Sequence, residues 1–167
     1  MKCPNCSKEM NCKPGKYHYT ESGLNNIYLS GVEICKCNDC GESSVSLPAI
    51  MELHRLICLT LVSKDTLLTG NEIRFLRKNA GYSAKEFTEL IGVDKSTFSR
   101  WENDNQVMAN TNDRLIRLAY LNIKGITQKE IEHIIKDKFK GIDPKKKEPS
   151  YFNIPVKKWA NHNTCRV

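Results

Sequence analysis

Two Cys-x-x-Cys pairs lie in the first 48 residues, Cys3 with Cys6 and Cys37 with Cys40, separated by 30 residues. The rest of this segment has few large aliphatic side chains and many turn formers, so it cannot bury enough apolar surface to fold without crosslinks or a metal. Two residues between thiols let both sulfurs reach one tetrahedral ion, and four thiolates are the closed ligand set that structural Zn²⁺ prefers. We therefore expect a zinc β-ribbon over residues 1–48, with one structural Zn²⁺ per chain.

Other uses of the cysteines stay open. Iron fits the same four thiolates, and nothing in the spacing favours it over zinc. A redox Cys-x-x-Cys is disfavoured because such a motif normally belongs to a βαβ unit and needs no second pair. Cys12 and Cys35 stand outside both pairs, so they are either alternative ligands or, as we expect, packed or free thiols. His162 and Cys165 form a further conceivable ligand pair, but on a polar terminal stretch such spacing is more often chance.

The first residues carry no apolar segment behind their charge, so we expect no secretory signal and a cytoplasmic protein. A reducing cytoplasm argues against a disulfide scaffold. No apolar run approaches the roughly 20 residues that a membrane span needs, which excludes a transmembrane protein.

The charge of the chain is unevenly distributed. The 167 residues hold 26 Lys and Arg against 19 Asp and Glu, a net charge of +7. Residues 1–48 and 49–68 are each neutral, residues 69–122 carry +1, and residues 123–167 carry +6. Because a basic patch indicates nucleic-acid binding only where it is clustered, the excess singles out the C-terminal segment. Three roles stay open for that segment: it contacts DNA phosphates, it becomes ordered on a protein partner, or it is a solvated chain end.

Helix signals begin after Pro48. The apolar run from Ile50 to Val62 predicts a helical linker within residues 49–68. Three capping boxes follow, in which a hydroxyl and a carboxylate three residues later satisfy free helix amides. The boxes are Thr69 with Glu72, Ser83 with Glu86, and Thr127 with Glu130. The apolar stripes that they open are Ile73 and Leu76; Phe87, Leu90 and Ile91; and Ile131, Ile134, Ile135 and Phe139.

Two short helices predict a helix-turn-helix. One covers residues 83–91 and the other residues 94–103, with a turn at Gly92-Val93 between them. Phe98 and Trp101, three residues apart, are expected to face inward. The side chains that then face outward are Lys95, Ser96, Ser99 and Arg100. An exposed face near the N-terminus of the second helix is where a recognition helix meets base edges.

The stretch from Tyr82 to Glu102 resembles the phage-repressor-like (XRE) helix-turn-helix family. It departs from the family's pattern at Ala84, where Gln is usual, and at Asn103, where Gly is usual. Position by position, the resemblance implies DNA contacts to bases or to backbone phosphates. The implied DNA-binding residues are Lys95, Ser96, Ser99, Arg100, Asn103 and Asn105. A helical bundle without a DNA role is the alternative.

A four-Cys ribbon followed by this helix-turn-helix is similar to the MqsA-type antitoxin family, which combines a YgiT-type zinc finger with an XRE domain. The similarity covers residues 1 to about 122 and includes the Met1-Lys2-Cys3-Pro4-x-Cys6 opening. It implies a homodimer that binds palindromic double-stranded operator DNA, represses its own operon, and neutralises a small ribonuclease toxin through its zinc domain. The alternative is a stand-alone zinc-ribbon regulator, of a prophage or mobile element, with no toxin partner.

The expected fold is α+β with two small domains. Residues 1–48 form the zinc ribbon, 49–68 the helical linker, 69–122 the DNA-binding helical bundle, and 123–167 a helix plus a basic tail. The tail is expected to be extended or partly disordered from Asp143 onward, because it is rich in Lys and Pro. We expect no enzyme, since no Ser/His/Asp or Cys/His grouping, phosphate loop or open metal site is evident.

Overall fold

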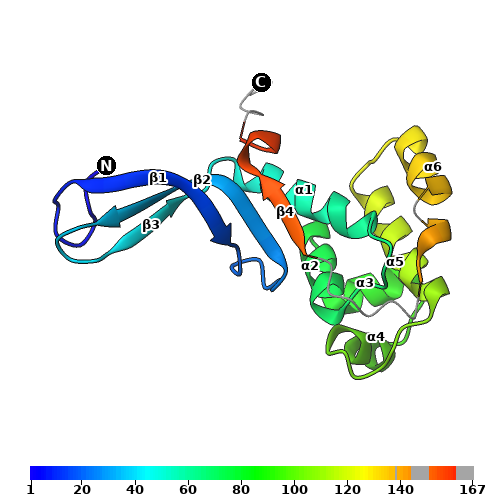
Figure 1. Ribbon diagram of the computed structural model, residues 1–167. Coiled ribbons are helices and arrows are strands. Elements are labelled where there is room, and N and C mark those ends of the chain that lie inside the picture. Colours follow the sequence, from blue (N-terminus) through cyan, green and yellow to red (C-terminus); the bar gives the residue numbers. More distant parts are fainter. Residues whose placement is uncertain (138, 144–150, 161–167) are drawn as a thin grey trace. The chain divides into compact units, whose positions relative to one another are not determined.

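The computed structural model in Figure 1 describes residues 1–137, 139–143 and 151–160. Within them the chain is α+β, with six α-helices and one small sheet, as the sequence predicts. The contacts divide it into two compact units. The ribbon unit comprises Met1–Glu21, Asn25–Leu56 and residues 151–160; the helical unit comprises Ser22–Leu24, residues 57–137 and residues 139–143. No helix of these residues has the length and hydropathy to cross a bilayer.

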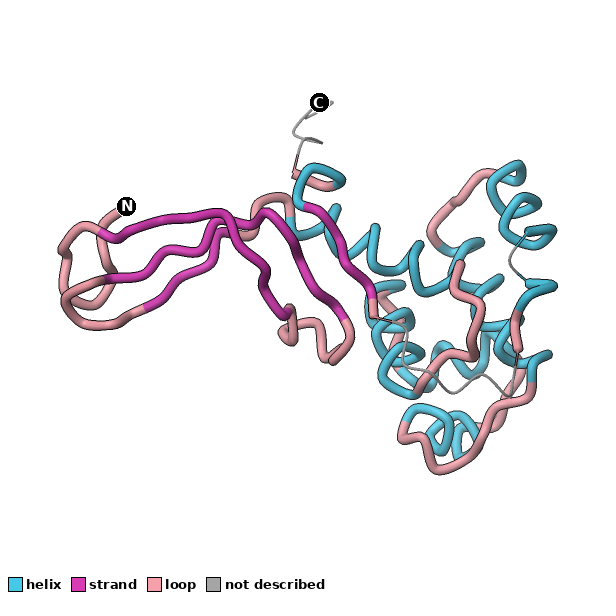
Figure 2. Tube along the Cα trace, in the orientation of Figure 1, coloured by secondary structure: helices cyan, strands magenta, loops and turns pink. Residues whose placement is uncertain are grey.

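The ribbon unit is organised around β2. β1 (Met10–His18) pairs antiparallel with one edge of β2 (Ile27–Cys37), and β3 (Ser43–Ser46) pairs antiparallel with the other. β4 (Phe152–Pro155) runs parallel to the first residues of β2 (Figure 2). Apolar and polar residues alternate over 16–19 and 32–35, which predicts strands at these positions in β1 and β2. β3 and β4 carry no comparable pattern.

A bulge in β2 makes room for the C-terminal strand. The register passes from Gly15 opposite Val32 to Lys16 opposite Ser30, which leaves Gly31 without a partner on β1. Gly31 has φ of 77°, and a Cβ there would lie 3.2 Å from Cγ1 of Val156. Glycine adopts this left-handed backbone without steric cost, so Gly31 allows both the bulge and the close approach of the segment after β4.

The expectation of an extended tail is confirmed at Phe152–Pro155, which form β4, but that of a partly disordered tail is wrong for residues 151–160. The Phe152 N–H donates to the Asn26 carbonyl at 2.9 Å, and Ile154 is buried. Trp159, which follows the 3₁₀ turn η2 (Val156–Lys158), is 0% exposed. The apolar residues between the lysines therefore pack into the ribbon unit, an outcome that composition alone does not reveal.

The helical unit begins in the middle of α1 (Ile50–Val62), which belongs to the ribbon unit up to Leu56. Each predicted capping box is present, and the helices that they open start one residue later. The remaining helices are α2 (Gly70–Ala80), α3 (Ala84–Ile91), α4 (Lys95–Glu102), α5 (Asn110–Ile123) and α6 (Gln128–Asp137). One predicted core residue is wrong: Leu90 is 52% exposed, and Thr88 occupies the buried face of α3 beside Phe87.

A buried ion pair on α5 organises the start of the helical unit. Nε of Arg117 lies 2.7 Å from Oδ2 of Asp113, and both side chains are 0% exposed. The Arg117 guanidinium also donates to backbone carbonyls at the end of α1 and just beyond it; the acceptors are Leu61, Val62, Lys64 and Thr66. Asp113 accepts from the Leu68 N–H at 2.8 Å. Carbonyls that a helix end leaves unpaired thus receive a charged donor.

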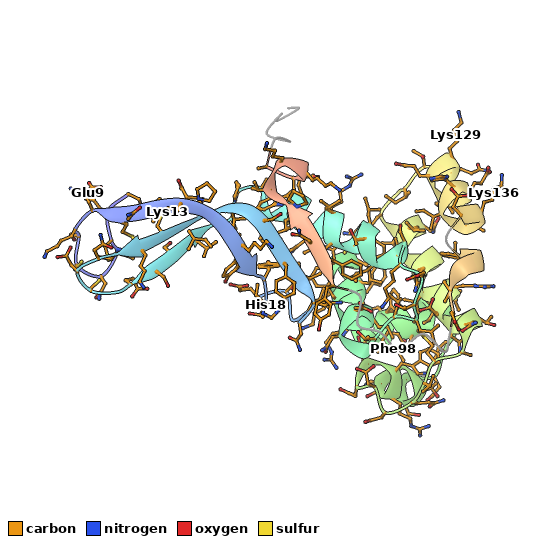
Figure 3. All side chains as sticks on the ribbon, in the orientation of Figure 1. Glu9, Lys13, His18, Phe98, Lys129 and Lys136 are labelled. Atoms are coloured by element: carbon orange, nitrogen blue, oxygen red, sulfur yellow. A yellow bond between two sulfur atoms is a disulfide. The ribbon has the colours of Figure 1, made fainter. Side chains whose placement is uncertain are left out.

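α6 is amphipathic, but none of its side chains is fully buried. Ile131 and Ile134 are half-buried, and Ile135 is 38% exposed, so the predicted stripe is only partly covered. Lys129 and Lys136 point away from the other helices (Figure 3). The stripe becomes buried only at Phe139, in the 3₁₀ turn η1 (Phe139–Gly141).

The burial of Trp159 predicts a large effect of its truncation. Trp159→Ala should destabilise the docking of residues 151–160 by about 3 kcal/mol or more, because a large buried ring is replaced by a cavity. Hydrogen exchange at the amides of residues 27–30 should then accelerate roughly a hundredfold. Lys158→Ala, at an exposed neighbour, should leave the exchange rates unchanged. Equal rates in the Trp159 variant and the unmodified protein would contradict the packing.

Candidate metal centre and exposed recognition surface

Four cysteines converge at one end of the ribbon unit. Sγ of Cys3 lies 3.5 Å from Sγ of Cys40, and Sγ of Cys6 lies 3.5 Å from Sγ of Cys37. All four sulfurs lie within 4.8 Å of one another. A tetrahedral ion with bonds of about 2.3 Å places its sulfurs about 3.8 Å apart. The four predicted ligands can therefore hold one metal ion with small adjustments.

The two Cys-x-x-Cys turns have the same backbone geometry. The Ser7 N–H donates to the Cys3 carbonyl at 2.9 Å, and the Gly41 N–H donates to the Cys37 carbonyl at 3.1 Å. Ser7 and Gly41 both have positive φ, 61° and 77°. The chain thus reverses immediately after the second cysteine of each pair, which turns both thiols toward one point. Lys8 and Asp39 add an ion pair between the turns at 2.6 Å.

Backbone amides prepare one of these sulfurs to act as a thiolate. The N–H groups of Cys40 and Asp39 bond to Sγ of Cys37 and lower the pKa of this thiol to about 7. The Lys8 amide acts in the same direction on Cys6, but the sulfurs of Cys37 and Cys40 outweigh it and raise the pKa of Cys6 to about 12.

Cys12 and Cys35 form a disulfide, so the expectation of packed or free thiols is wrong for this pair. They lie directly opposite each other on β1 and β2, with Cα atoms 3.9 Å apart. Cys12, Glu33 and Cys35 form a second group of residues that could bind a metal, but Cys12 and Cys35 are bonded to each other. Cys12 and Cys35 are thus not additional ligands in this state. Cys58, in α1, is a free thiol whose pKa burial raises to about 12.

The sequence signal that could identify the disulfide is weak. Cys12 and Cys35 lie 23 residues apart, with no short motif to join them. Their pairing follows from the β1–β2 register, which depends on the length of the hairpin and on the bulge beyond it. Neither quantity is readable from the cysteine spacing.

In the helical unit, the residues that the sequence assigns to DNA contact lie on α4 and in the segment just after it. The six predicted DNA-binding residues are all exposed; they are Lys95, Ser96, Ser99, Arg100, Asn103 and Asn105. The opposite side of the helix is buried through Phe98 and Trp101 (Figure 3 labels Phe98). The Phe98 ring lies 5.6 Å from that of Phe87 on α3, between centroids. This side anchors the helix.

The C-terminal end of α4 is tied to α2. Arg77 of α2 forms a buried ion pair with Glu102, with Nε 2.9 Å from Oε1. Arg74 donates to the Glu102 carbonyl at 2.8 Å. At the start of α2, a Cβ on Gly70 would lie 2.5 Å from that carbonyl oxygen, so only glycine fits. These contacts hold α4 in one orientation against its neighbours.

Hydrogen bonds distinguish among the six exposed residues. The Ser96 hydroxyl donates to Asp94 at 2.5 Å and lowers the pKa of this carboxyl, together with the backbone amides of Thr97 and Ser96. Asn103 donates to the Ser99 carbonyl at 2.8 Å and accepts from Arg74 at 2.9 Å. Ser96 and Asn103 therefore also maintain the ends of α4.

Among the described residues, no hydrogen bond or ion pair involves the side chain of Lys95 or Arg100. The Arg100 carbonyl accepts the Asn105 N–H at 2.8 Å, and the positive charge of the Arg100 side chain helps to lower the pKa of the Asp94 carboxyl. Both cations are exposed on α4. Their donors are thus available to a ligand, and so is the exposed side chain of Asn105.

An open groove of about 360 Å³ crosses one face of the β1–β2 hairpin. Its lining consists of Asn11, Lys13, Pro14, Gly15, Ile34, Lys36 and Asn38. The lining contains two lysines and no carboxylate, and neither Lys13 nor Lys36 has an ion pair among the described residues. Lys13 is labelled on β1 in Figure 3. The groove thus combines two lysines, which suit an anionic group, with the apolar side chains of Pro14 and Ile34.

The histidines stay apart from one another. His18 stacks on Tyr28, with centroids 4.6 Å apart, His54 bonds to the Tyr19 hydroxyl, and His133 pairs with Asp137 on α6. His162 and Cys165, the conceivable ligand pair, lie outside the described residues. The described histidines thus contribute to packing or to the surface.

Comparison with known proteins identifies no relative: no family model, no curated protein and no solved structure matches the chain. The functional argument therefore depends on the two sites themselves.

The four-thiol cluster predicts one bound metal ion per chain. Replacement of one ligand in each turn, Cys3→Ser/Cys37→Ser, should abolish binding, because two thiolates no longer close a tetrahedral shell. Elemental analysis of the purified chain measures the metal directly. Cys58→Ser, at a buried thiol outside the cluster, should retain the full metal content. A fully loaded double variant would show that other residues hold the metal.

Proposed function

We propose that the protein is a sequence-specific transcriptional repressor that reads double-stranded operator DNA with α4. The observation that carries the proposal is the pair of exposed cations, Lys95 and Arg100, on a helix whose other side is anchored. Recognition helices of the helix-turn-helix type use this arrangement in the major groove. The short connection between α3 and α4, with Gly92 in the left-handed conformation, supports the same assignment.

Arg100 is the residue best suited to base recognition. Its guanidinium can donate two parallel hydrogen bonds to O6 and N7 of a guanine, which discriminates against other bases by roughly 1–3 kcal/mol. Residues 69–122 carry a net charge of only +1, so long-range attraction to phosphate is weak there. We infer that a few side chains on α4, rather than bulk charge, set the DNA preference. By the resemblance to MqsA-type antitoxins, the active form is a homodimer on a palindromic operator.

The metal of the ribbon unit is, in this proposal, Zn²⁺ in a structural role. Four soft thiolates suit Zn²⁺, and together they fill its coordination shell, which leaves no position for a reactive water. Cys3 and Cys6, which precede β1, would be joined to Cys37 and Cys40 at the end of β2. The ion would thereby crosslink a segment that buries little apolar surface.

A protein partner is the second part of the proposal. The resemblance to MqsA-type antitoxins implies a small toxin that binds the zinc-bearing unit, and the basic groove of the hairpin supports a docking role there. A regulator without a toxin remains the alternative.

Co-expression with the product of an adjoining small reading frame tests the partner. We expect the two proteins to co-purify, and Lys13→Glu/Lys36→Glu to weaken the complex at least tenfold, because the groove loses both positive charges. The matched control, Lys157→Glu/Lys158→Glu, reverses two exposed lysines outside the groove and should not weaken it. Absence of any complex would favour the stand-alone regulator.

The DNA-binding role predicts a selective effect of Arg100→Ala. Loss of a bidentate base contact should weaken binding to the operator, sought upstream of the protein's own gene, by roughly 10- to 100-fold. Binding to unrelated DNA should fall by less than about threefold, because the variant loses only one positive charge that attracts the DNA phosphates. A gel-shift titration at fixed salt measures both affinities.

Lys129→Ala is the matched control, since it removes an exposed cation from α6. It should leave operator preference intact. Equal losses on operator and unrelated DNA in the Arg100 variant would argue against base recognition by α4.

A further inference from the structure

The disulfide between Cys12 and Cys35 lies beside the candidate metal centre. Cys35 is two residues before the ligand Cys37 on β2, so both side chains are on the same face of the strand. Cys3, Met10, Cys35 and Cys37 form one buried cluster, and Cys6 and Cys12 pack against it. Two different crosslinks, a covalent bond and a four-thiolate site, therefore act on the same end of the hairpin.

The two residues of the disulfide differ in exposure. Cys35 is 1% exposed, whereas Cys12 is half-buried. A thiol from solution thus reaches Cys12 first, and Cys35 is the sulfur that leaves. This asymmetry allows exchange with a reductant without prior opening of the buried cluster.

The two crosslinks would constrain the same part of the hairpin. The metal would join residues 3 and 6 to residues 37 and 40, and the disulfide joins Cys12 to Cys35 two residue pairs along the same ladder. Each link would close nearly the same loop, so either one would favour the same β1–β2 register. Without both, this end of the unit retains only a small buried cluster, made mainly of the cysteines themselves.

We propose that Cys12 and Cys35 form a reversible thiol–disulfide site whose state decides whether this end of the ribbon unit stays folded without metal. Its reactant is a dithiol, either a small molecule or a protein. In the oxidised state the hairpin tolerates metal loss; in the reduced state the metal is its one crosslink. The proposal goes beyond the DNA-binding role and does not depend on it.

Reduction proceeds in two balanced steps. The first thiol of the reductant attacks Sγ of Cys12, the Cys12–Cys35 bond breaks, and Cys35 leaves with the proton of that thiol. The second thiol of the reductant then attacks the mixed disulfide and releases Cys12 as a thiol. Two electrons pass to the protein, and the dithiol becomes a cyclic or intramolecular disulfide.

The test uses the full chain in four states: oxidised or reduced with dithiothreitol, each with metal bound or removed by a chelator. Trypsin cleavage after Lys16 and Lys36, which lie in β1 and β2, reports whether the hairpin is folded. Both metal-bound states should resist cleavage. The metal-free oxidised chain should be cleaved at least about tenfold more slowly than the metal-free reduced chain.

Cys12→Ser/Cys35→Ser separates this disulfide from any that the four ligands form with one another after metal loss. With metal, the variant should resist trypsin like the unmodified chain, which establishes that it folds. Without metal, it should be cleaved at the fast rate under both oxidising and reducing conditions. Cys58→Ser should behave like the unmodified chain in every state.

Three results would overturn the proposal. Equal cleavage rates of the metal-free oxidised and reduced chains would exclude a stabilising role of the disulfide. Persistent redox dependence in the Cys12→Ser/Cys35→Ser variant would assign the effect to other cysteines. Peptide mapping that finds Cys12 and Cys35 unlinked in the metal-bound chain, after treatment with oxidised dithiothreitol, would exclude the site itself.

Discussion

The ribbon unit depends on the stability of β2, a long strand in a segment with little apolar surface of its own. At the Cys37 end, four thiols and a disulfide bring the two sides of the hairpin together. At the Ile27 end, the chain returns from far along the sequence to add β4 and to bury Trp159. Small domains need such supports because their apolar burial does not offset the entropy of ordering the chain. The two ends of β2 thus use different physical means to the same effect.

Buried charge plays the corresponding role in the helical unit. Arg117 supplies donors to carbonyls at the end of α1, and Asp113 neutralises it while accepting a backbone amide. Arg77 and Glu102 connect α2 to the far end of α4. Such pairs are costly to desolvate, and they impose one geometry because a misplaced partner leaves a buried charge unpaired. The exposed face of α4, on which the proposed DNA contact depends, is therefore held in one orientation relative to α2.

Local signals predicted much of the fold and the four-thiol cluster. The capping boxes at Thr69 and Ser83 located helix starts to within a residue, because the hydroxyl and carboxylate act within one turn. The four-thiol cluster was also predictable, since each Cys-x-x-Cys turn determines its own geometry. Leu90 was mispredicted because helical periodicity tells which side chains share a face, not which part of that face a neighbouring helix covers.

Sequence alone determined the α+β class, the helix starts and the four cysteines that lie together, because these follow from interactions within a few residues. Only the tertiary structure decided that Cys12 bonds to Cys35, that residues 151–160 add a strand to β2, and that Arg117 is buried. Each of these depends on a strand register or on a contact between distant segments. Such contacts are set by the packing of the whole unit, which no single motif encodes.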